Sequence, residues 1–194
     1  MIRKADFRFN RGSLALDFTA TRGYRKGRAV ERVPAPADLG RWFAAASLAE
    51  RTATTLAEYR RAIALREAIY SLGSALLEAR KPAASDVATI NAAAAARRAT
   101  QELDPKTLRI RQAARASVGT ALARIAEDAI ALFGGPDRAR LRSCRHPSCG
   151  ALMLNAQSGP ERQWCSMATC GNRAKVAAYR QRQSAPASAK TAGD

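Results

Sequence analysis

The chain contains four cysteines, and all of them lie within 27 residues near its C-terminal end. They form two pairs with the same C-x4-C spacing, and 15 residues separate the pairs. Each close pair can turn the chain so that both sulfurs face one point, and the segment between the pairs is long enough for a hairpin. Four thiolates at tetrahedral corners suit Zn²⁺, which has no redox chemistry. The sequence therefore predicts one structural zinc ion bound by Cys144, Cys149, Cys165 and Cys170.

Other uses of four clustered cysteines are two disulfides, a redox-active dithiol or an iron–sulfur cluster. Disulfides need an oxidising compartment, but the chain begins with the charged segment MIRKADFRFN and has no apolar run of signal-peptide length. No stretch approaches the ~18 consecutive apolar residues of a membrane span. We therefore expect a cytoplasmic protein without a membrane segment, and zinc is favoured over the three alternatives. Because four thiolates complete the shell, the single histidine, His146, is interpreted as a loop residue.

The composition predicts a polyanionic partner. The chain carries 33 basic and 16 acidic residues, which gives a formal charge of +17. Codon usage can favour Arg over Lys, but it does not explain a two-to-one excess over acidic residues. The excess is densest around the cysteines, where residues 137–194 have a net charge of +7. A charge of this size and sign is typical of proteins that bind nucleic acids.

The first 50 residues combine strand and helix patterns. Short strands are expected at Phe7–Phe9 and Leu14–Phe18, and a basic loop or hairpin tip is expected at Arg22–Arg32. Asp38 is expected to cap a helix. The apolar residues of this helix recur with helical spacing: Leu39, Trp42, Phe43 and Ala46.

Helices dominate the middle of the chain. The longest is expected to begin at Thr52 or Thr54 and to end near Arg80. Ser85 is expected to cap the next helix, and a short strand is expected at Leu108–Arg111. A further helix is expected over Ser117–Phe133.

The triplet Gly134–Pro136 ends the last of these helices and is the expected boundary between two domains. The predicted division is a helical domain at 1–136, a metal-binding module at 137–183 and a disordered tail at 184–194. Within the module the expected elements are three short strands, Leu141–Cys144, Ala151–Asn155 and Arg162–Cys165, and a helix, Asn172–Gln183.

The terminal helix is the expected nucleic-acid contact. Asn172 is expected to cap it, while Val176 and Tyr179 are expected to pack inward. Arg173 has a second interpretation, stacking on Trp164, and the whole helix has an alternative one, docking on an acidic partner protein. Three arginines before or between the cysteines extend the expected positive surface: Arg140, Arg142 and Arg145. The basic residues assigned to nucleic-acid binding are Arg173, Lys175, Arg180 and Arg182.

The segment Cys170-Gly171-Asn172-Arg173 resembles the signature of the CGNR zinc-finger family, and the similarity runs from about Leu141 to Arg182. The family pattern has Trp and Asp in the strand after the first cysteine pair. This chain has Gly150–Asn155 there, without either residue, although the four cysteines are all present.

The N-terminal part resembles the ABATE domain, which precedes CGNR fingers in many bacterial proteins. The similar residues are Leu14–Phe18, Thr21, Leu39 and Trp42, while Ala20 stands where the family usually has Asn. The resemblance implies a bacterial transcription regulator, some members of which are described as stress-induced.

Together these observations predict an α+β, mostly α protein: a helical N-terminal domain with a small β-sheet, then a treble-clef-like zinc finger made of a β-hairpin and a helix. The expected function is DNA-binding transcription regulation, with the N-terminal domain sensing a small molecule or forming a homodimer. Asp17 and Trp42 are the candidate ligand pocket. The alternative is a zinc-stapled protein-interaction or RNA-binding module. No enzyme is expected, because the chain has no phosphate-binding glycine loop and no Ser-His or Cys-His pair outside the metal site.

Overall fold

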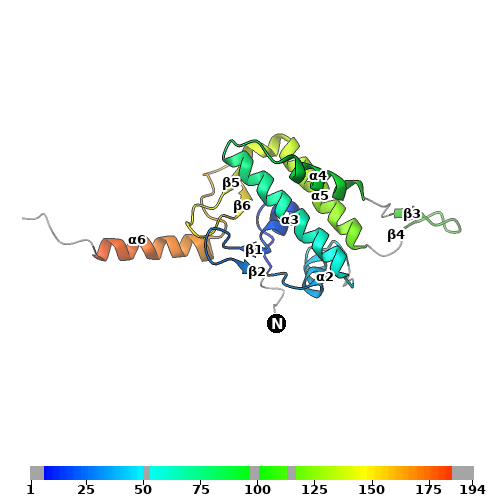
Figure 1. Cartoon of the computed structure of the whole chain (residues 1–194), viewed down its shortest axis with the longest axis horizontal. Coiled ribbons are helices and arrows are strands. Elements are labelled where there is room, and N and C mark those ends of the chain that lie inside the picture. The colour runs from blue at the N-terminus through cyan, green and yellow to red at the C-terminus, as the bar shows by residue number, and fades with distance from the viewer. Residues whose placement is uncertain (1–6, 50–52, 97–100, 113–116, 185–194) are drawn as a thin grey trace, which may run out of the picture.

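The computed structural model describes residues 7–49, 53–96, 101–112 and 117–184, and within these ranges five helices form the main body (Figure 1). The helices are α1 (Leu14–Thr19), α2 (Pro36–Ala45), α3 (Leu56–Leu77), α4 (Ala84–Ala95) and α5 (Val118–Gly134).

The described strands form three two-stranded antiparallel hairpins. They are β1 (Arg22–Gly23) with β2 (Val30–Glu31), β3 (Gln101–Leu103) with β4 (Ile110–Gln112), and β5 (Leu141–Ser143) with β6 (Leu152–Leu154). A 3-10 turn, η2 (Pro136–Arg140), precedes β5, and a π turn, η3 (Met167–Gly171), leads directly into the last helix, α6 (Asn172–Ser184). Figure 1 shows α6 leaving the body on one side and β3–β4 on the opposite side. This arrangement confirms the predicted fold class.

One hydrophobic core extends across the body and the first hairpin of the cysteine-rich segment. Trp42 lies at its centre, fully buried, with ring centroids 4.9 Å from Phe18 and 5.9 Å from Phe43. Leu141 and Leu152 belong to the same cluster as these aromatic residues. The domain boundary after residue 136 therefore stays a prediction, since residues on both sides of it share one core.

The strand expected at Leu14–Phe18 is wrong, because these residues form α1. A carboxylate oxygen of Asp128, on α5, accepts hydrogen bonds from the Ala15 amide (2.8 Å) and from the Ser13 hydroxyl. This tertiary partner satisfies an amide at the helix start. The run is apolar except for Asp17 because α1 packs against both α3 and α5, and periodicity does not separate a short buried helix from a buried strand.

Two expected caps lie inside their helices. Asp38 is the third residue of α2, which begins at Pro36, and its carboxylate accepts a hydrogen bond from the Ala35 amide at 3.2 Å. Proline is favoured at the first helical position because its ring fixes a helical φ. Ser85 is likewise the second residue of α4, which begins at Ala84.

The N-cap of α3 is Thr55, one residue after Thr54; Thr52 lies outside the described residues. The Thr55 hydroxyl accepts from the Glu58 amide (3.2 Å) and the Glu58 carboxylate accepts from the Thr55 amide (2.8 Å), so the pair forms a capping box. The helix expected over Ser117–Phe133 is confirmed as α5, with Ser117 as its N-cap, whose hydroxyl accepts from the Thr120 amide at 3.2 Å.

Among the remaining strands, those expected near Leu141 and Ala151 are confirmed as β5 and β6. Residues Phe7–Phe9 form no strand. Phe7 is buried, and the ring centroids of Phe9 and Trp42 are 5.7 Å apart. Leu108–Arg111 becomes a strand only from Ile110, because Leu108 has a φ of +52° and lies in the turn. Arg162–Cys165 forms no strand. The Arg162 side chain donates hydrogen bonds to the Trp164 and Cys165 carbonyls, which would otherwise be available to a neighbouring strand.

A buried arginine attaches the β1–β2 hairpin to the body. Arg66, on α3, is 2% exposed and donates two hydrogen bonds of 2.7 Å to the Glu31 carboxylate. It also pairs with Glu67 at 2.8 Å, and Glu67 accepts a 2.6 Å hydrogen bond from Arg25 in the hairpin. Burial alone would raise the pKa of Glu67, but the hydrogen bonds and charges of Arg25 and Arg66 outweigh it and lower that pKa. The segment Arg22–Arg32, expected as a mobile basic loop or a hairpin tip, thus forms a hairpin that ion pairs hold to the body.

We predict that Arg66→Ala destabilises the fold strongly, whereas Arg60→Ala, at an exposed position of the same helix, does not. Removing Arg66 takes two charge-assisted hydrogen bonds from Glu31 and one from Glu67, which keeps Arg25, and we expect a cost of about 1.5–3 kcal/mol. An exposed substitution changes the free energy of unfolding by about 0.5 kcal/mol or less. Urea denaturation of both variants measures the difference, and equal stabilities would contradict this role for Arg66.

Candidate metal centre

The four cysteine side chains meet at one point in the folded chain. Their Sγ atoms all lie within 4.8 Å of one another, each cysteine is buried and none forms a disulfide. Two of the Sγ–Sγ distances, Cys149–Cys165 and Cys165–Cys170, are 3.5 Å. A tetrahedral site with Zn–S bonds of about 2.3 Å has Sγ–Sγ edges of about 3.8 Å. The donor atoms therefore fit one structural zinc ion with a closed shell, as predicted.

Local backbone turns aim each cysteine. Cys144 follows β5, and its amide donates to the Ala151 carbonyl at 2.8 Å, which closes the hairpin. The Cys149 amide donates to the His146 carbonyl at 2.9 Å, so His146 lies in the turn, as expected. Gly150 has a φ of +63°, where a side chain would be strained and would meet Lys26 and Tyr70.

The second cysteine pair connects the metal site to α6. Cys170 lies in the π turn η3, which continues into α6 without a break. Asn172 is therefore not the N-cap that the sequence suggested, because helical turns begin five residues earlier. Gly171 lies in a close contact: an added Cβ would lie 2.9 Å from Met167 Sδ, at the end of an exposed side chain, and 3.2 Å from Trp164 Cδ1. Zinc binding to Cys170 thus anchors the start of the helix.

Two arginines that sequence reasoning missed support Cys165. Arg11, 3% exposed, donates to the Cys165 carbonyl, and Arg162 donates to the same oxygen at 2.7 Å. Hydrogen bonds from the Cys144 and Cys149 thiols, together with the charge of Arg11, lower the pKa of Cys165. Since the thiolate is the metal ligand, these cations favour binding. Arg11 and Cys165 are 154 residues apart, and no local pattern relates them.

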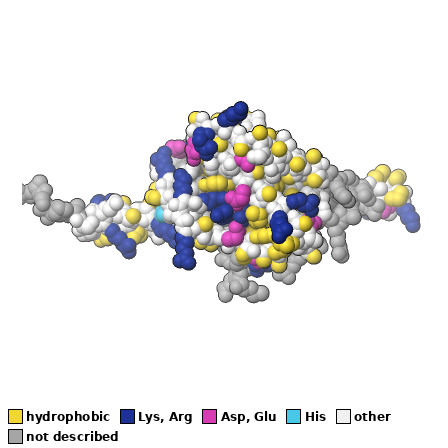
Figure 2. Space-filling view, viewed as in Figure 1, with side chains coloured by type: hydrophobic (Ala, Val, Ile, Leu, Met, Phe, Trp, Pro, Cys, Tyr) yellow, Lys and Arg dark blue, Asp and Glu magenta, His cyan; other side chains and the backbone are white. Residues whose placement is uncertain are grey.

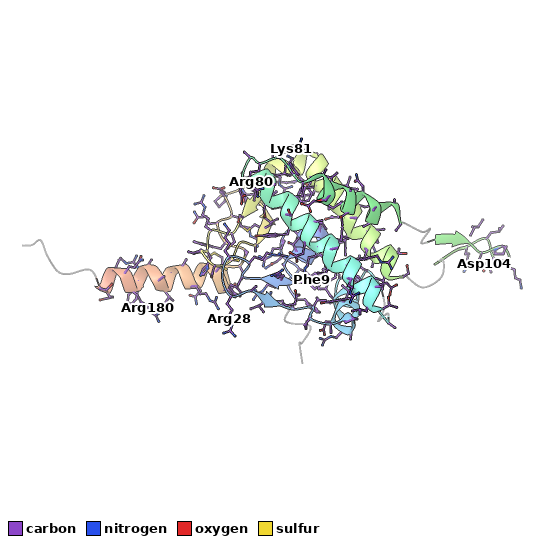
Figure 3. All side chains as sticks on the ribbon, viewed as in Figure 1. Phe9, Arg28, Arg80, Lys81, Asp104 and Arg180 are labelled. Atoms are coloured by element: carbon purple, nitrogen blue, oxygen red, sulfur yellow. The ribbon has the colours of Figure 1, made fainter. Side chains whose placement is uncertain are left out.

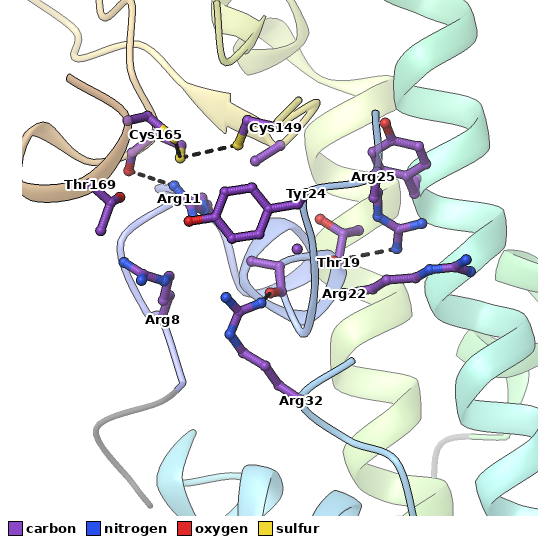
Figure 4. Close-up of a pocket in the computed structure, with 15 residues that line it drawn as sticks. Arg8, Arg11, Thr19, Arg22, Tyr24, Arg25, Arg32, Cys149, Cys165 and Thr169 are labelled. Atoms are coloured by element: carbon purple, nitrogen blue, oxygen red, sulfur yellow. Dashed lines mark hydrogen bonds between the residues drawn. The ribbon is translucent and has the colours of Figure 1, made fainter. Parts of the chain in front are cut away.

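The β1–β2 hairpin contacts the finger directly (Figure 4). The Arg25 amide donates to the Cys149 carbonyl at 2.9 Å, and the Arg25 guanidinium lies 3.9 Å from the centre of the Tyr70 ring. The guanidinium carbon of Arg173 lies 5.0 Å from the centre of the Tyr24 ring. Arg173 therefore contacts Tyr24, and the alternative contact with Trp164 is wrong.

The terminal helix projects from the molecule. No residue of α6 is buried; Val176 is 41% exposed and Tyr179 is 56% exposed, so the expected inward packing of these two residues is wrong. All four basic residues assigned to nucleic-acid binding are exposed. Figure 2 shows Lys and Arg side chains along this projection, and Figure 3 places Arg180 on it well away from the body.

The arginines expected to extend the positive surface are paired with carboxylates. Arg140 lies 2.6 Å from Asp137 and also donates to the Asn155 carbonyl. Arg142 and Arg145 both pair with Glu161, at 2.9 and 3.0 Å. Their charge is therefore offset locally, in contrast to that of α6, which contains no acidic residue.

The two residues of the candidate ligand pocket occupy different surroundings, and the pocket stays a prediction. The Asp17 carboxylate accepts from the Arg11 amide at 2.8 Å, and burial raises its pKa from 3.8 to about 6. Trp42 is enclosed by aromatic rings, and its Nε1 has no hydrogen-bond partner. Neither residue lines either of the two described cavities, whereas Ala20 lines one of them.

We predict one Zn²⁺ per chain, with Zn–S distances of about 2.3 Å by X-ray absorption. Cys170→Ser should lower zinc affinity and unfold α6, because η3 is the main anchor of this helix and the Arg173–Tyr24 contact is a single addition to it. Circular dichroism should then show loss of the α6 contribution with the body helices retained. The matched control is His146→Ala, which should keep zinc. A metal-free protein, or zinc lost with His146, would contradict the assigned ligands.

The raised pKa of Asp17 predicts that the protein loses stability as the pH rises and this carboxyl ionises. A carboxyl with a folded pKa of about 6 and an unfolded value of 3.8 binds its proton more tightly in the folded state. Its contribution to stability is complete below about pH 3.8 and is lost as the pH rises through about 6. Asp17→Asn keeps the acceptor for the Arg11 amide but does not ionise. Relative to the parent, its free energy of unfolding should rise by up to about 3 kcal/mol between pH 4 and pH 7, and a difference independent of pH would contradict this prediction.

Comparisons with known proteins agree with this architecture. No described helix is both long enough and apolar enough to cross a membrane. The ABATE family, described as "Putative stress-induced transcription regulator", matches residues 12–136, and the CGNR zinc finger matches residues 140–183. A search of curated proteins found no match. Since the first match covers more than half of the chain, the protein belongs to the ABATE family, and it carries a C-terminal CGNR zinc finger.

Proposed function

We propose that the protein is a DNA-binding bacterial transcription regulator in which zinc holds α6 against duplex DNA. The observation that carries this proposal is α6 itself: a helix without a buried residue, with four basic and no acidic residues, fixed at its start by a metal ligand. The ABATE description as a regulator family agrees with it. This role places the protein in the bacterial cytoplasm, where its thiols remain reduced.

The stability of α6 favours an external partner. A helix of 13 residues is marginal in water unless packing supports it, because helix formation starts with an unfavourable nucleus. The anchored start at η3 removes part of that nucleation cost. Binding to a polyanion would support the remainder, since it neutralises the repulsion between neighbouring cations.

The distribution of side chains around α6 fits a DNA groove. At roughly 100° per residue, Arg173 and Arg180 form one row, and Lys175 and Arg182 form a second row on the opposite side. Val176 and Tyr179 lie between the two rows, where both are exposed. A helix in the major groove presents one face to base edges and reaches phosphates on both sides. We infer that the apolar strip faces the bases and the basic rows face the two backbones.

One of the two described cavities supports a sensor role for the N-terminal domain. It lies among α3, α4 and α5, has a volume of about 270 Å³ and is lined mainly by apolar side chains. Val87 and Ile130 at this surface are 40% and 43% exposed. The cavity is slightly smaller than the roughly 300–1,000 Å³ of typical ligand pockets, so we infer a small apolar effector. A homodimer that covers the same surface is the alternative.

The test replaces the four basic residues of α6 with Ala and measures binding to duplex DNA over a range of salt concentrations. The matched control replaces four exposed basic residues of the body: Arg60, Arg61, Arg80 and Lys81. If each residue of α6 contacts a phosphate, the variant should bind at least ~100-fold more weakly at low salt, and the slope of log K against log salt should fall by about three to four units. The control should change both much less.

Circular dichroism and zinc content show whether each variant stays folded. A folded, zinc-loaded α6 variant that binds duplex DNA as tightly as the parent would remove α6 from the interface. Tighter binding of the parent to single-stranded RNA than to duplex DNA would favour the RNA-binding alternative. Absence of any nucleic-acid binding would favour the protein-interaction module.

A further inference from the structure

A cavity rich in arginine lies where the N-terminal segment, the β1–β2 hairpin and the zinc finger meet (Figure 4). Its described lining contains five arginines and no carboxylate, together with three of the zinc ligands, Cys149, Cys165 and Cys170. We call it the arginine cavity, and its cationic residues are Arg8, Arg11, Arg22, Arg25 and Arg32.

Part of the charge in the arginine cavity has no internal partner. Arg22 and Arg25 share Glu67, at 3.8 and 2.6 Å. Arg8 is half-buried and makes no hydrogen bond or ion pair with any described residue. Two positive charges thus share one carboxylate, and a third has none.

Two buried guanidinium nitrogens in the cavity lining also lack partners. They are the Nε atoms of Arg11 and Arg25, whose side chains are almost completely buried. Buried polar groups normally have a hydrogen-bond partner, because leaving one unpaired costs free energy. Each Nε has less than 1 Å² of exposed surface, so these two atoms add to the positive charge of the lining but do not contact an external ligand directly.

The zinc site does not account for this excess. A Zn²⁺ ion with four thiolates has a net charge of −2, and Glu67 adds one more negative charge. The five arginines still leave the region positive, and Arg66 beneath the hairpin has its own partner in Glu31. The neighbouring α6 adds further positive charge, since Arg173 lies over the Tyr24 ring that lines the cavity.

We propose that the arginine cavity binds a single phosphate group. The planar guanidinium of Arg matches phosphate oxygens in pairs, and Figure 4 shows Arg8, Tyr24 and Arg32 around one opening beside Arg11. The space inside is about 20 Å³ for water-sized groups. A water molecule needs roughly 10–15 Å³ by the same measure, so the enclosed space holds about one phosphate oxygen, and the rest of the group would lie outside it.

The phosphate has two chemical sources, the backbone of DNA or the phosphate of a free small molecule. The site does not depend on the proposed role of α6, because α6 contributes none of its lining residues. If the α6 variant leaves DNA binding unchanged, the proposal that the arginine cavity binds phosphate still stands. The two proposals can therefore fail separately.

The experiment titrates the full-length, zinc-loaded protein with inorganic phosphate and, at matched ionic strength, with chloride. Arg8→Ala is the main variant, because Arg8 has no described internal bond to lose. Tyr24→Phe removes the hydroxyl but keeps the ring beneath Arg173, and Arg60→Ala is the control for loss of one exposed arginine. Calorimetry measures phosphate affinity, and a random-sequence duplex measures DNA affinity for the same four proteins.

For a free phosphate ligand, phosphate should bind saturably to the parent and to Arg60→Ala, at least tenfold more weakly to Arg8→Ala, and duplex affinity should stay within about twofold. For a DNA phosphate, Arg8→Ala should weaken duplex binding and lower its salt slope by about one unit, and Arg60→Ala should not. The proposal is overturned if phosphate binding survives Arg8→Ala, or if phosphate acts only as chloride does and Arg8→Ala binds duplex DNA as Arg60→Ala does.

Discussion

The position of α6 depends on the zinc–thiolate bonds. The helix buries none of its residues and continues from the turn that contains Cys170. Nearly all of its direct connection to the molecule passes through that turn, with the Arg173–Tyr24 contact as an additional one. A four-thiolate shell is closed to water and substrate. The metal therefore has a structural role and fixes the turn from which α6 begins. As a consequence, α6 is rigid at its start and exposed along its length, and such a helix is suited to contact a binding partner.

The high positive charge of the chain divides into two physical roles. Some arginines are structural: Arg66 is buried against Glu31 and Glu67, and Arg11 and Arg162 hold the carbonyl of Cys165. Such buried cations are stable only because carboxylates or carbonyls surround them. The arginines of α6 lack such surroundings and remain in water. A net charge of +17 therefore overstates the surface available to a polyanion, and the distribution of partners shows which cations are available.

The β1–β2 hairpin is the connection between the body and the finger. Its strands are only two residues long, so backbone pairing contributes little to its order. Ion pairs to α3 hold one side, and the Arg25 amide bonded to the Cys149 carbonyl holds the other. Because Tyr24 and Arg25 are adjacent, the same hairpin contacts α6, the metal-binding turn and the body. A change in α3 thus has a short, directly bonded route to the metal centre.

The sequence by itself determined the metal site and the helical character of the protein, because both depend on local spacing. The C-x4-C pairs identify the ligands without any other information, and the helix start expected at Ser117 is correct because the amide that its hydroxyl caps, that of Thr120, lies three residues away. The tertiary structure decided what depended on distant partners. Leu14–Phe18 is a helix because Asp128 caps it and two other helices bury it. Arg11 supports Cys165 across 154 residues, and the arginine cavity exists only because three separate segments converge. Local sequence patterns do not predict such long-range contacts, since those residues come together only when the hydrophobic core forms.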